Sequence, residues 1–193
     1  LEELKSALEN ITPSDFSRYQ QLLTLLKDKE YGWTGATDDR VVIFTERIET
    51  MKYLAARLRE DLKMPANAIQ EISGAMSDAE QQTIVENFGR EEAPVRVLVA
   101  SDVASEGLNL HYLSHRMIHF DIPWSLMVFQ QRNGRIDRYG QQKRPDIRYM
   151  MIESNNPRIK GDMRIIEILI TKEEQALKNI GDPALLLGKF SIE

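Results

Sequence analysis

The stretch RVVIFTERIETMKYLAARL, Arg40 to Leu58, changes its hydrophobic period halfway along. Its first part holds four consecutive apolar residues, three of them β-branched, which is typical of a strand buried on both faces. From Ile48 onward the apolar residues recur at helical spacing, so we expect an amphipathic helix from Ile48 to Leu62 that ends before Pro65. A short buried strand that leads directly into a helix is the unit from which parallel sheets are built.

The same alternation continues downstream. We expect further strands at AIQEIS, VRVLVA, HRMIHFD and DIRYMMI, with helices over Asp78 to Phe88, after Pro123, and over Asp162 to Ile180. Met150 and Met151 fall in the last strand and are expected to pack in the core. The pattern predicts an α/β domain of three layers, with a mainly parallel central sheet and helices on both faces.

Residues 1–39 differ from this pattern and are expected to form an N-terminal helical segment or linker. Helical periodicity there is interrupted at ITPSDF and followed by the polar loop YGWTGATDDR. The main domain is expected over residues 40–160, and residues 161–193 are expected to form a bracing helix and a tail. The chain starts at Leu1 rather than at methionine, which is typical of a piece excised from a longer protein.

Composition limits the possible partners. With 25 Lys and Arg against 30 Asp and Glu, the net charge is −5, so a generic polyanion binder is excluded. Between Gln130 and Arg148, however, six basic residues stand against two acidic ones. The absence of cysteine excludes disulfides and thiolate metal sites and fits a reducing cytoplasm. No apolar run reaches the length of about 18 residues that a membrane span needs.

Polar loops follow the predicted strands. They are FTERIE, ISGAMSD, ASDVASEGLNL and FDIPWS. In parallel sheets, ligands gather at the carboxyl ends of the strands, and the Ser, Thr, Gly, Asp and Asn residues of these loops suit phosphate and hydroxyl recognition. The alternative is that loops of any α/β domain are polar.

The stretch QQRNGRIDRYGQ, Gln130 to Gln141, carries the most specific chemistry. If it is helical, Gln131, Arg135 and Arg138 lie on one side and Gly134 leaves a gap beside them. Two guanidinium groups in fixed register can hold a polyphosphate and neutralise charge that develops in phosphoryl transfer. The alternative is a solvated helix face, the usual position of charged residues.

These stretches resemble the motifs of superfamily-two helicases and translocases. QQRNGRIDRYGQ is similar to motif VI, which reads Q-x-x-x-R-x-x-R-x-G-Q in Swi/Snf-type enzymes. VLVASDVASEGLNL resembles motif V, while RVVIFTERIETMKYLAARL and ISGAMSDAEQQTIVENF resemble motifs IV and IVa. HFDIPWS is similar to the D-x-x-W-N stretch, with Ser125 where asparagine is usual. Over residues 40–151 the resemblance implies the C-terminal RecA-like lobe of a bacterial Swi/Snf-related enzyme.

The resemblance also implies roles for individual residues. Arg135 and Arg138 would be arginine fingers that reach ATP on another lobe, and Gln131 would lie near the γ-phosphate or the attacking water. The positions that approach the nucleotide are Glu106, Gly107 and Asn109. The positions that contact the nucleic-acid phosphates are Thr45, Ser73 and Ser101. Glu106 and Asp137 depart from the commonest Swi/Snf choices, which leaves the subfamily open.

The parts that would hold the nucleotide are missing from this sequence. The nearest string to a P-loop, GDPALLLGKF, has the wrong spacing and ends in Phe190, and no Asp-Glu pair ends a strand. ATP and Mg²⁺ would therefore be held mainly by an N-terminal RecA-like lobe of the same parent chain. We expect no ATP hydrolysis from this chain alone, because phosphoryl transfer needs those groups.

The expected function is that of the second motor lobe of an ATP-dependent translocase that acts on double-stranded DNA in the cytoplasm. One alternative is a non-enzymatic RecA-like module that binds a protein or RNA. Another is a lobe of an RNA-directed helicase, because the Glu106-Gly107 pair also resembles RNA-sensing relatives. The sequence leaves open the choice between DNA and RNA, the pathway and the oligomeric state.

Histidine and tryptophan suggest further sites. His111, His115 and His119 recur every fourth residue, but His119 lies in an expected strand, where that spacing does not gather metal ligands, so we assign no metal. Trp33 and Trp124 would either stack on bases or pack, and packing is the favoured interpretation.

Overall fold

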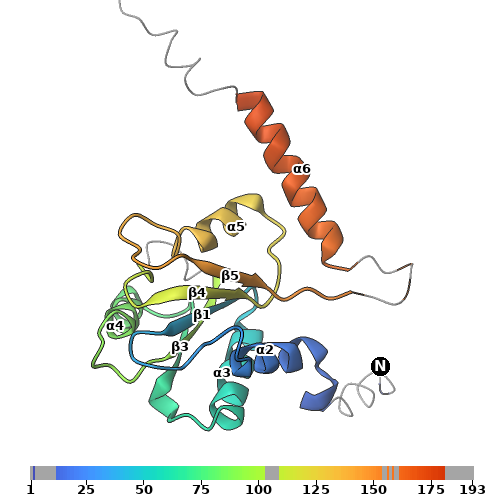
Figure 1. The fold of residues 1–193 in the computed structure, drawn as a ribbon. Coiled ribbons are helices and arrows are strands. Elements are labelled where there is room, and N and C mark those ends of the chain that lie inside the picture. Colours follow the sequence, from blue (N-terminus) through green and yellow to red (C-terminus); the bar gives the residue numbers. More distant parts are fainter. Residues whose placement is uncertain are drawn as a thin grey trace, which may run out of the picture.

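A five-stranded parallel sheet forms the centre of the computed structural model, which describes residues 12–102, 109–153 and 161–180 together with Glu2, Asn156 and Arg158. The strand order is β2-β3-β1-β4-β5, and every neighbouring pair is parallel (Figure 1). The strands are β1 (Arg40–Thr45), β2 (Ile69–Ile72), β3 (Val97–Ser101), β4 (Ser114–His119) and β5 (Asp146–Tyr149). The predicted parallel α/β sheet is confirmed.

Helices cover both faces of this sheet. They are α2 (Ser17–Lys27), α3 (Ile48–Asp61), α4 (Asp78–Phe88), α5 (Leu126–Asn133) and α6 (Met163–Ile180), with short 3₁₀ turns at Pro13–Asp15 and Ala66–Ala68. The α2 and α3 helices pack on one face, while Phe88 of α4 lies in the core of the other. None of the described helices is both long enough and apolar enough to cross a bilayer.

The central strand β1 shows why the chain folds into three layers. Val41 and Ile43 belong to the core on one face, and Val42 and Phe44 belong to the core on the other. Side chains alternate along a strand, so a run of four apolar residues supplies both cores at once. All four are fully buried, as the continuous apolar pattern predicted.

The helix of the N-terminal segment packs into the same core. Tyr19, Leu22 and Leu26 of α2 are buried there, and the Tyr19 hydroxyl donates to Asp61 of α3 over 2.6 Å. This part of residues 1–39 thus packs as an element of the lobe, whereas the predicted boundaries at residues 39/40 and 160/161 stay predictions. The α6 helix leads away from the sheet and contacts α5 (Figure 1).

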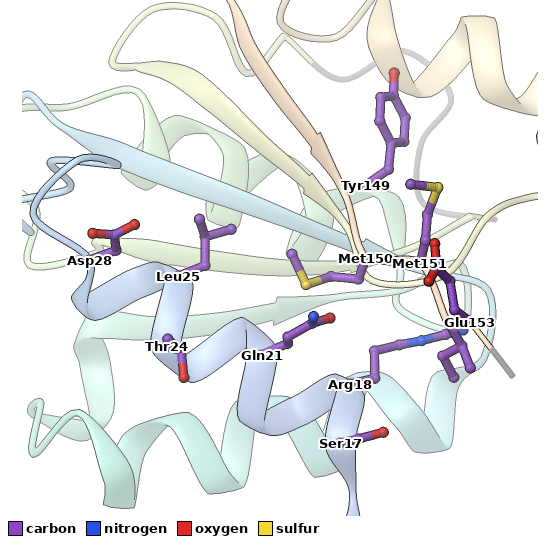
Figure 2. A pocket seen from close by; sticks show the side chains of 11 residues that line it. Ser17, Arg18, Gln21, Thr24, Leu25, Asp28, Tyr149, Met150, Met151 and Glu153 are labelled. Atoms are coloured by element: carbon purple, nitrogen blue, oxygen red, sulfur yellow. The ribbon is translucent and has the colours of Figure 1, made fainter. Parts of the chain in front are cut away.

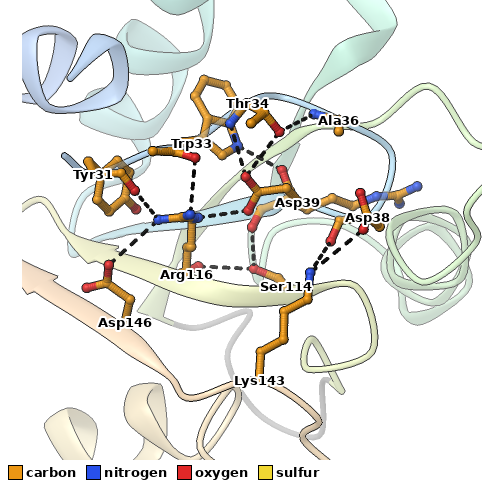
Figure 3. Close-up of polar contacts among 12 residues, drawn as sticks. Tyr31, Trp33, Thr34, Ala36, Asp38, Asp39, Ser114, Arg116, Lys143 and Asp146 are labelled. Atoms are coloured by element: carbon orange, nitrogen blue, oxygen red, sulfur yellow. Dashed lines mark hydrogen bonds and ion pairs between the residues drawn. The ribbon is translucent and has the colours of Figure 1, made fainter. Parts of the chain in front are cut away.

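Arg116 of β4 fixes the loop that leads into β1. Its Nε donates to Asp39 over 2.8 Å, and its guanidinium lies 4.7 Å from the centre of the Tyr31 ring (Figure 3). Trp33 of the same loop donates its indole N–H to the Asp39 carbonyl over 2.8 Å and packs against the core, as expected. This arrangement sets where the sheet begins, at the edge opposite the strand ends that carry Thr45 and Ser101.

Three details of the predicted elements were wrong. The α5 helix ends at Asn133 with Gly134 as its C-cap, so Arg135 and Arg138 lie in the turns that follow and not on one helix face with Gln131. A Cβ at Gly134 would lie 3.3 Å from the Gln130 carbonyl oxygen, which explains why glycine suits this tight end. Strand β5 ends at Tyr149, and Met151 is exposed rather than in the core.

Candidate functional site

The carboxyl ends of three strands, β1, β2 and β3, bring the sequence-predicted phosphate contacts together. Thr45 of β1 pairs in register with Ser101 of β3, and Ser73 follows directly after β2, which pairs with β3. Asp121 follows β4 on the other side of β1. The three hydroxyl residues therefore lie along one edge of the sheet, as parallel strands require.

These hydroxyl groups are more enclosed than a phosphate-binding surface suggests. Thr45, Ser73 and Ser101 are all buried. The Thr45 hydroxyl donates to Asp121 Oδ2 over 2.5 Å, and the backbone N–H of Glu46 donates to the same carboxylate over 2.9 Å. Within the described part of the chain, the Ser101 hydroxyl has no hydrogen-bond partner.

Arg132, which the sequence did not single out, ties this edge to α5. Its side chain is fully buried (0% exposed), and its Nε donates to Asp102 over 2.5 Å. Its terminal nitrogens donate to the carbonyl of Asp121 over 3.0 Å and to its carboxylate over 3.3 Å. The guanidinium also lies 5.6 Å from the centre of the Phe44 ring. Two carboxylates and an aromatic face thus compensate one buried charge.

His119 of β4 contacts Asn133, the last residue of α5. Its ring stacks on Tyr149 at 4.8 Å between centroids, and Nε2 lies 2.9 Å from the amide oxygen of Asn133. Burial, together with the nearby charge of Arg132, lowers the pKa of His119 to about 4. The neutral ring can then donate from Nε2 to Asn133 and accept at Nδ1 from Arg132, 3.3 Å away. The residue is a packing and hydrogen-bonding element of the core.

The proposed finger residues differ in exposure. Gln131 of α5 and Arg135, just after its end, are half-buried, whereas Arg138 is exposed. The guanidinium of Arg138 donates to the side-chain oxygen of Asn109. Asn109, which was predicted to approach the nucleotide, thus bonds to Arg138, which was predicted to be an arginine finger. Glu106 and Gly107 lie outside the described residues.

The turn that carries Arg138 is anchored by Gln141. The Gln141 side-chain amide donates to the carbonyl oxygens of Ser114 over 3.0 Å and Ile136 over 3.2 Å. Its backbone N–H donates to the Arg138 carbonyl over 3.0 Å and closes the turn. Ile136, two residues before Arg138, is fully buried in the core. The motif glutamine therefore acts here as a brace for the turn.

Only some of the six basic residues between Gln130 and Arg148 add positive charge to the surface. Arg132 is buried, Lys143 lies 3.8 Å from a carboxylate oxygen of Asp38, and Arg148 pairs with Asp146 at 2.6 Å. These pairs neutralise part of the local surplus, and Arg138 and Arg144 of this cluster are exposed.

The prediction that both tryptophans pack in the core was wrong for Trp124. It is 70% exposed in the loop between β4 and α5, and Met127 on the first turn of α5 is exposed as well. The preceding residues Ile122 and Pro123 are buried, so they fix the loop and direct the indole outward. Near the carboxyl edge of the sheet the chain therefore presents an aromatic plane to solvent.

The described residues also line a hollow away from these predicted contacts. It measures about 780 Å³ and lies between α2 and the chain after β5, with Arg18 and Gln21 on one side and Met150 and Met151 on the other (Figure 2). None of the predicted nucleotide or nucleic-acid contacts lines it. We assign no ligand to it.

Comparison with protein families gives a match over most of the chain. The helicase conserved C-terminal domain matches residues 17–140. The match begins at the first residue of α2 and ends at Gly140, in the turn from Arg138 to Gln141, which we call the finger turn.

Two curated relatives extend this match. RNA polymerase-associated protein RapA of Vibrio campbellii is 32% identical over 131 residues, which cover 68% of this chain and 12% of that protein. The uncharacterized ATP-dependent helicase YqhH of Bacillus subtilis is 30% identical over 157 residues, which cover 80% of this chain and 26% of that protein. The chain therefore spans only a small part of the length of these relatives.

A solved structure agrees with the architecture. The DEAD-box protein SrmB of E. coli, bound to regulator of ribonuclease activity A, aligns with a TM-score of 0.52 and 30% identity. The alignment covers 69% of this chain and 69% of that one.

Proposed function

The chain belongs to the family of helicase conserved C-terminal domains, as its motifs predicted, and on this premise we propose that it is the second motor lobe of an ATP-dependent Swi/Snf-type translocase. ATP would be bound by a P-loop lobe that precedes it in the same parent chain. Arg135 and Arg138 would reach the phosphates as arginine fingers when the two lobes close.

The observation that carries this proposal is the contact between Arg138 and Asn109. The two residues are 29 positions apart, come from motifs VI and V, and meet at an exposed surface. Because Gln141 braces the turn, the backbone that carries Arg138 would need little rearrangement when a nucleotide arrives. Preorganised cations of this kind stabilise charge that develops in phosphoryl transfer.

Gln131, Glu106 and Gly107 complete the proposed nucleotide side of the lobe. Gln131 lies in α5, four residues before Arg135 in the sequence, and it would face the γ-phosphate or the attacking water. In the part of the chain that the structure describes, no group of three or more His, Asp or Glu side chains could hold a metal ion such as magnesium. Asp102 and Asp121, the carboxylates that follow β3 and β4, both bond with Arg132. A metal carboxylate is therefore assigned to the other lobe in this proposal.

Nucleic acid would bind along the carboxyl edge of the sheet. Thr45, Ser73 and Ser101 would face the phosphate backbone, and the exposed indole of Trp124 would add a stacking or packing surface beside them. Contacts to phosphate oxygens carry little sequence information, so binding should be salt-dependent and tolerant of sequence. We propose double-stranded DNA as the substrate, because the motif VI pattern is of the Swi/Snf form.

The direct experiment is an ATPase assay of the full-length parent with duplex DNA, single-stranded DNA and RNA. We expect hydrolysis that duplex DNA stimulates most, and no hydrolysis by the chain described here when it is purified alone. Stronger stimulation by RNA would favour an RNA-directed helicase. A parent without a P-loop and an Asp-Glu pair upstream of Leu1 would favour a non-enzymatic binding module and contradict the proposal.

A further inference from the structure

Tyr139 is fully exposed directly beside the proposed finger Arg138. Its relative exposure is 101%, the highest among the exposed large hydrophobic side chains of the described residues. Single exposed aromatic residues are common on protein surfaces, and exposure alone assigns no role. The backbone around Tyr139, however, is held by hydrogen bonds of Gln141.

The turn from Arg138 to Gln141 holds the tyrosine outward. Gly140 has a φ of +96°, a conformation that residues with a side chain rarely adopt, and the chain reverses there. The two hydrogen bonds from the Gln141 side chain fix the end of the turn to the carbonyl oxygens of Ser114 and Ile136. Tyr139 therefore stands at the apex of an anchored turn.

The surface next to this turn is also aromatic. Gly140 lies against His111, since a Cβ on this glycine would be 3.4 Å from the imidazole Nε2. The His111 ring in turn lies 4.3 Å from the exposed ring of Tyr112. Asn109, the partner of Arg138, lines a hollow of about 280 Å³ together with Tyr112. Hydrogen-bonding groups for a nucleotide and planar rings thus meet on one surface.

We propose that Tyr139 stacks on the adenine base of the ATP whose phosphates Arg138 contacts. This inference rests on the proposed function and adds a base contact from this lobe to the phosphate contacts. A base has two π faces, and an aromatic side chain that is already held outward covers one of them with little loss of side-chain freedom. Since Tyr139 is the residue next to Arg138, the lobe closure that brings the finger to the phosphates also moves the ring toward the nucleotide.

The test compares Tyr139→Ala and Tyr139→Phe in the full-length parent. We expect Tyr139→Ala to raise KM for ATP about fivefold or more, the factor that a stacking contact at the low end of its usual strength gives, with kcat changed less than about twofold. Tyr139→Phe keeps the ring and should behave as wild type. Inhibition by inorganic tripolyphosphate, which has no base, should be equal in all three proteins.

Three results would overturn the inference while leaving the proposed function in place. They are an unchanged KM in Tyr139→Ala, a parallel loss of tripolyphosphate inhibition, and a rise in KM with Tyr112→Ala but not with Tyr139→Ala. The second would mean that Tyr139 only positions Arg138. A parent that neither binds nor hydrolyses ATP would instead overturn the proposed function, and this inference with it.

Discussion

Arg132 and Asp102 are 30 residues apart in the chain, yet an Asp102 carboxylate oxygen lies 2.5 Å from the guanidinium of Arg132. Asp102 follows β3, and Arg132 lies in the last turn of α5, directly before the finger turns. The same guanidinium bonds to Asp121 at the end of β4, whose carboxylate accepts from Thr45. One buried cation therefore connects the proposed nucleic-acid edge to the base of the proposed fingers.

Replacing Arg132 by methionine should destabilise the chain by about 3 kcal/mol or more. Removing one partner of a buried ion pair leaves the other charge without compensation, here two neighbouring aspartates. Urea denaturation measures the loss. Arg57→Met is the matched control, because Arg57 also pairs with two carboxylates, but on the surface of α3, where such pairs contribute little. Equal midpoints for the two variants would show that the buried network does not stabilise the fold.

Stability should fall in mildly acidic solution because of His119. Burial and the charge of Arg132 lower the pKa of His119 to about 4 from an ordinary value of 6.5. Between these values the unfolded chain binds a proton that the folded chain excludes, so the folded state loses stability as the pH drops through this range. The expected loss between pH 7 and pH 5 is about 2 kcal/mol from this residue.

Chemical denaturation at the two pH values measures this effect. In His119→Gln, which does not titrate, the same change of pH should cost correspondingly less. Nuclear magnetic resonance of the wild-type imidazole gives an independent reading, and a titration midpoint near 6.5 in the folded chain would contradict the prediction.

Substitution of Gly140 by alanine should strain the finger turn. At a φ of +96° a Cβ costs about 1–3 kcal/mol, and the strain would shift Arg138 relative to Asn109. We expect lower thermal stability of the chain and slower ATP turnover by the parent. Gly89→Ala is the control, since Gly89 has a negative φ of −91° and its Cβ would find only ordinary contacts. Turnover that is the same in both variants would argue against a fixed turn.

The exposed indole of Trp124 should contribute to nucleic-acid binding and little to folding. Trp124→Ala is expected to weaken binding of the parent to duplex DNA about fivefold or more, as loss of a stacking contact does, with a change in stability below about 0.5 kcal/mol. Fluorescence anisotropy measures the affinity. Met127→Ala, another exposed apolar side chain nearby, should bind as wild type. Wild-type affinity in both variants would remove Trp124 from the proposed surface.

The sheet was predictable because its signal is periodic and local. Val41 to Phe44 alternate between the two cores, as four adjacent apolar residues do in a strand that is buried on both faces. The place of Thr45, Ser73 and Ser101 at one edge follows from the same logic, since it needs only the strand ends and the parallel order.

Other features depend on contacts that no local pattern reveals. Arg132 looked like part of a basic surface, and only the approach of Asp102 and Asp121 buries it. The α5 helix ends at Asn133 because Gly134 caps it, whereas helical spacing continued through Arg138 in the sequence. The exposure of Trp124 depends on how its neighbours are buried, which its own residue type does not indicate.

The most direct measurement of the central proposal is kcat for ATP hydrolysis by the full-length parent with Arg138→Ala and with Arg135→Ala. We predict that either variant lowers kcat by about a thousandfold or more, the contribution usual for an arginine finger, while duplex DNA binding persists. For Arg138→Ala, an exposed position, the thermal midpoint of this chain should stay that of wild type. Wild-type turnover in both variants would contradict the assignment of this lobe as the source of the fingers.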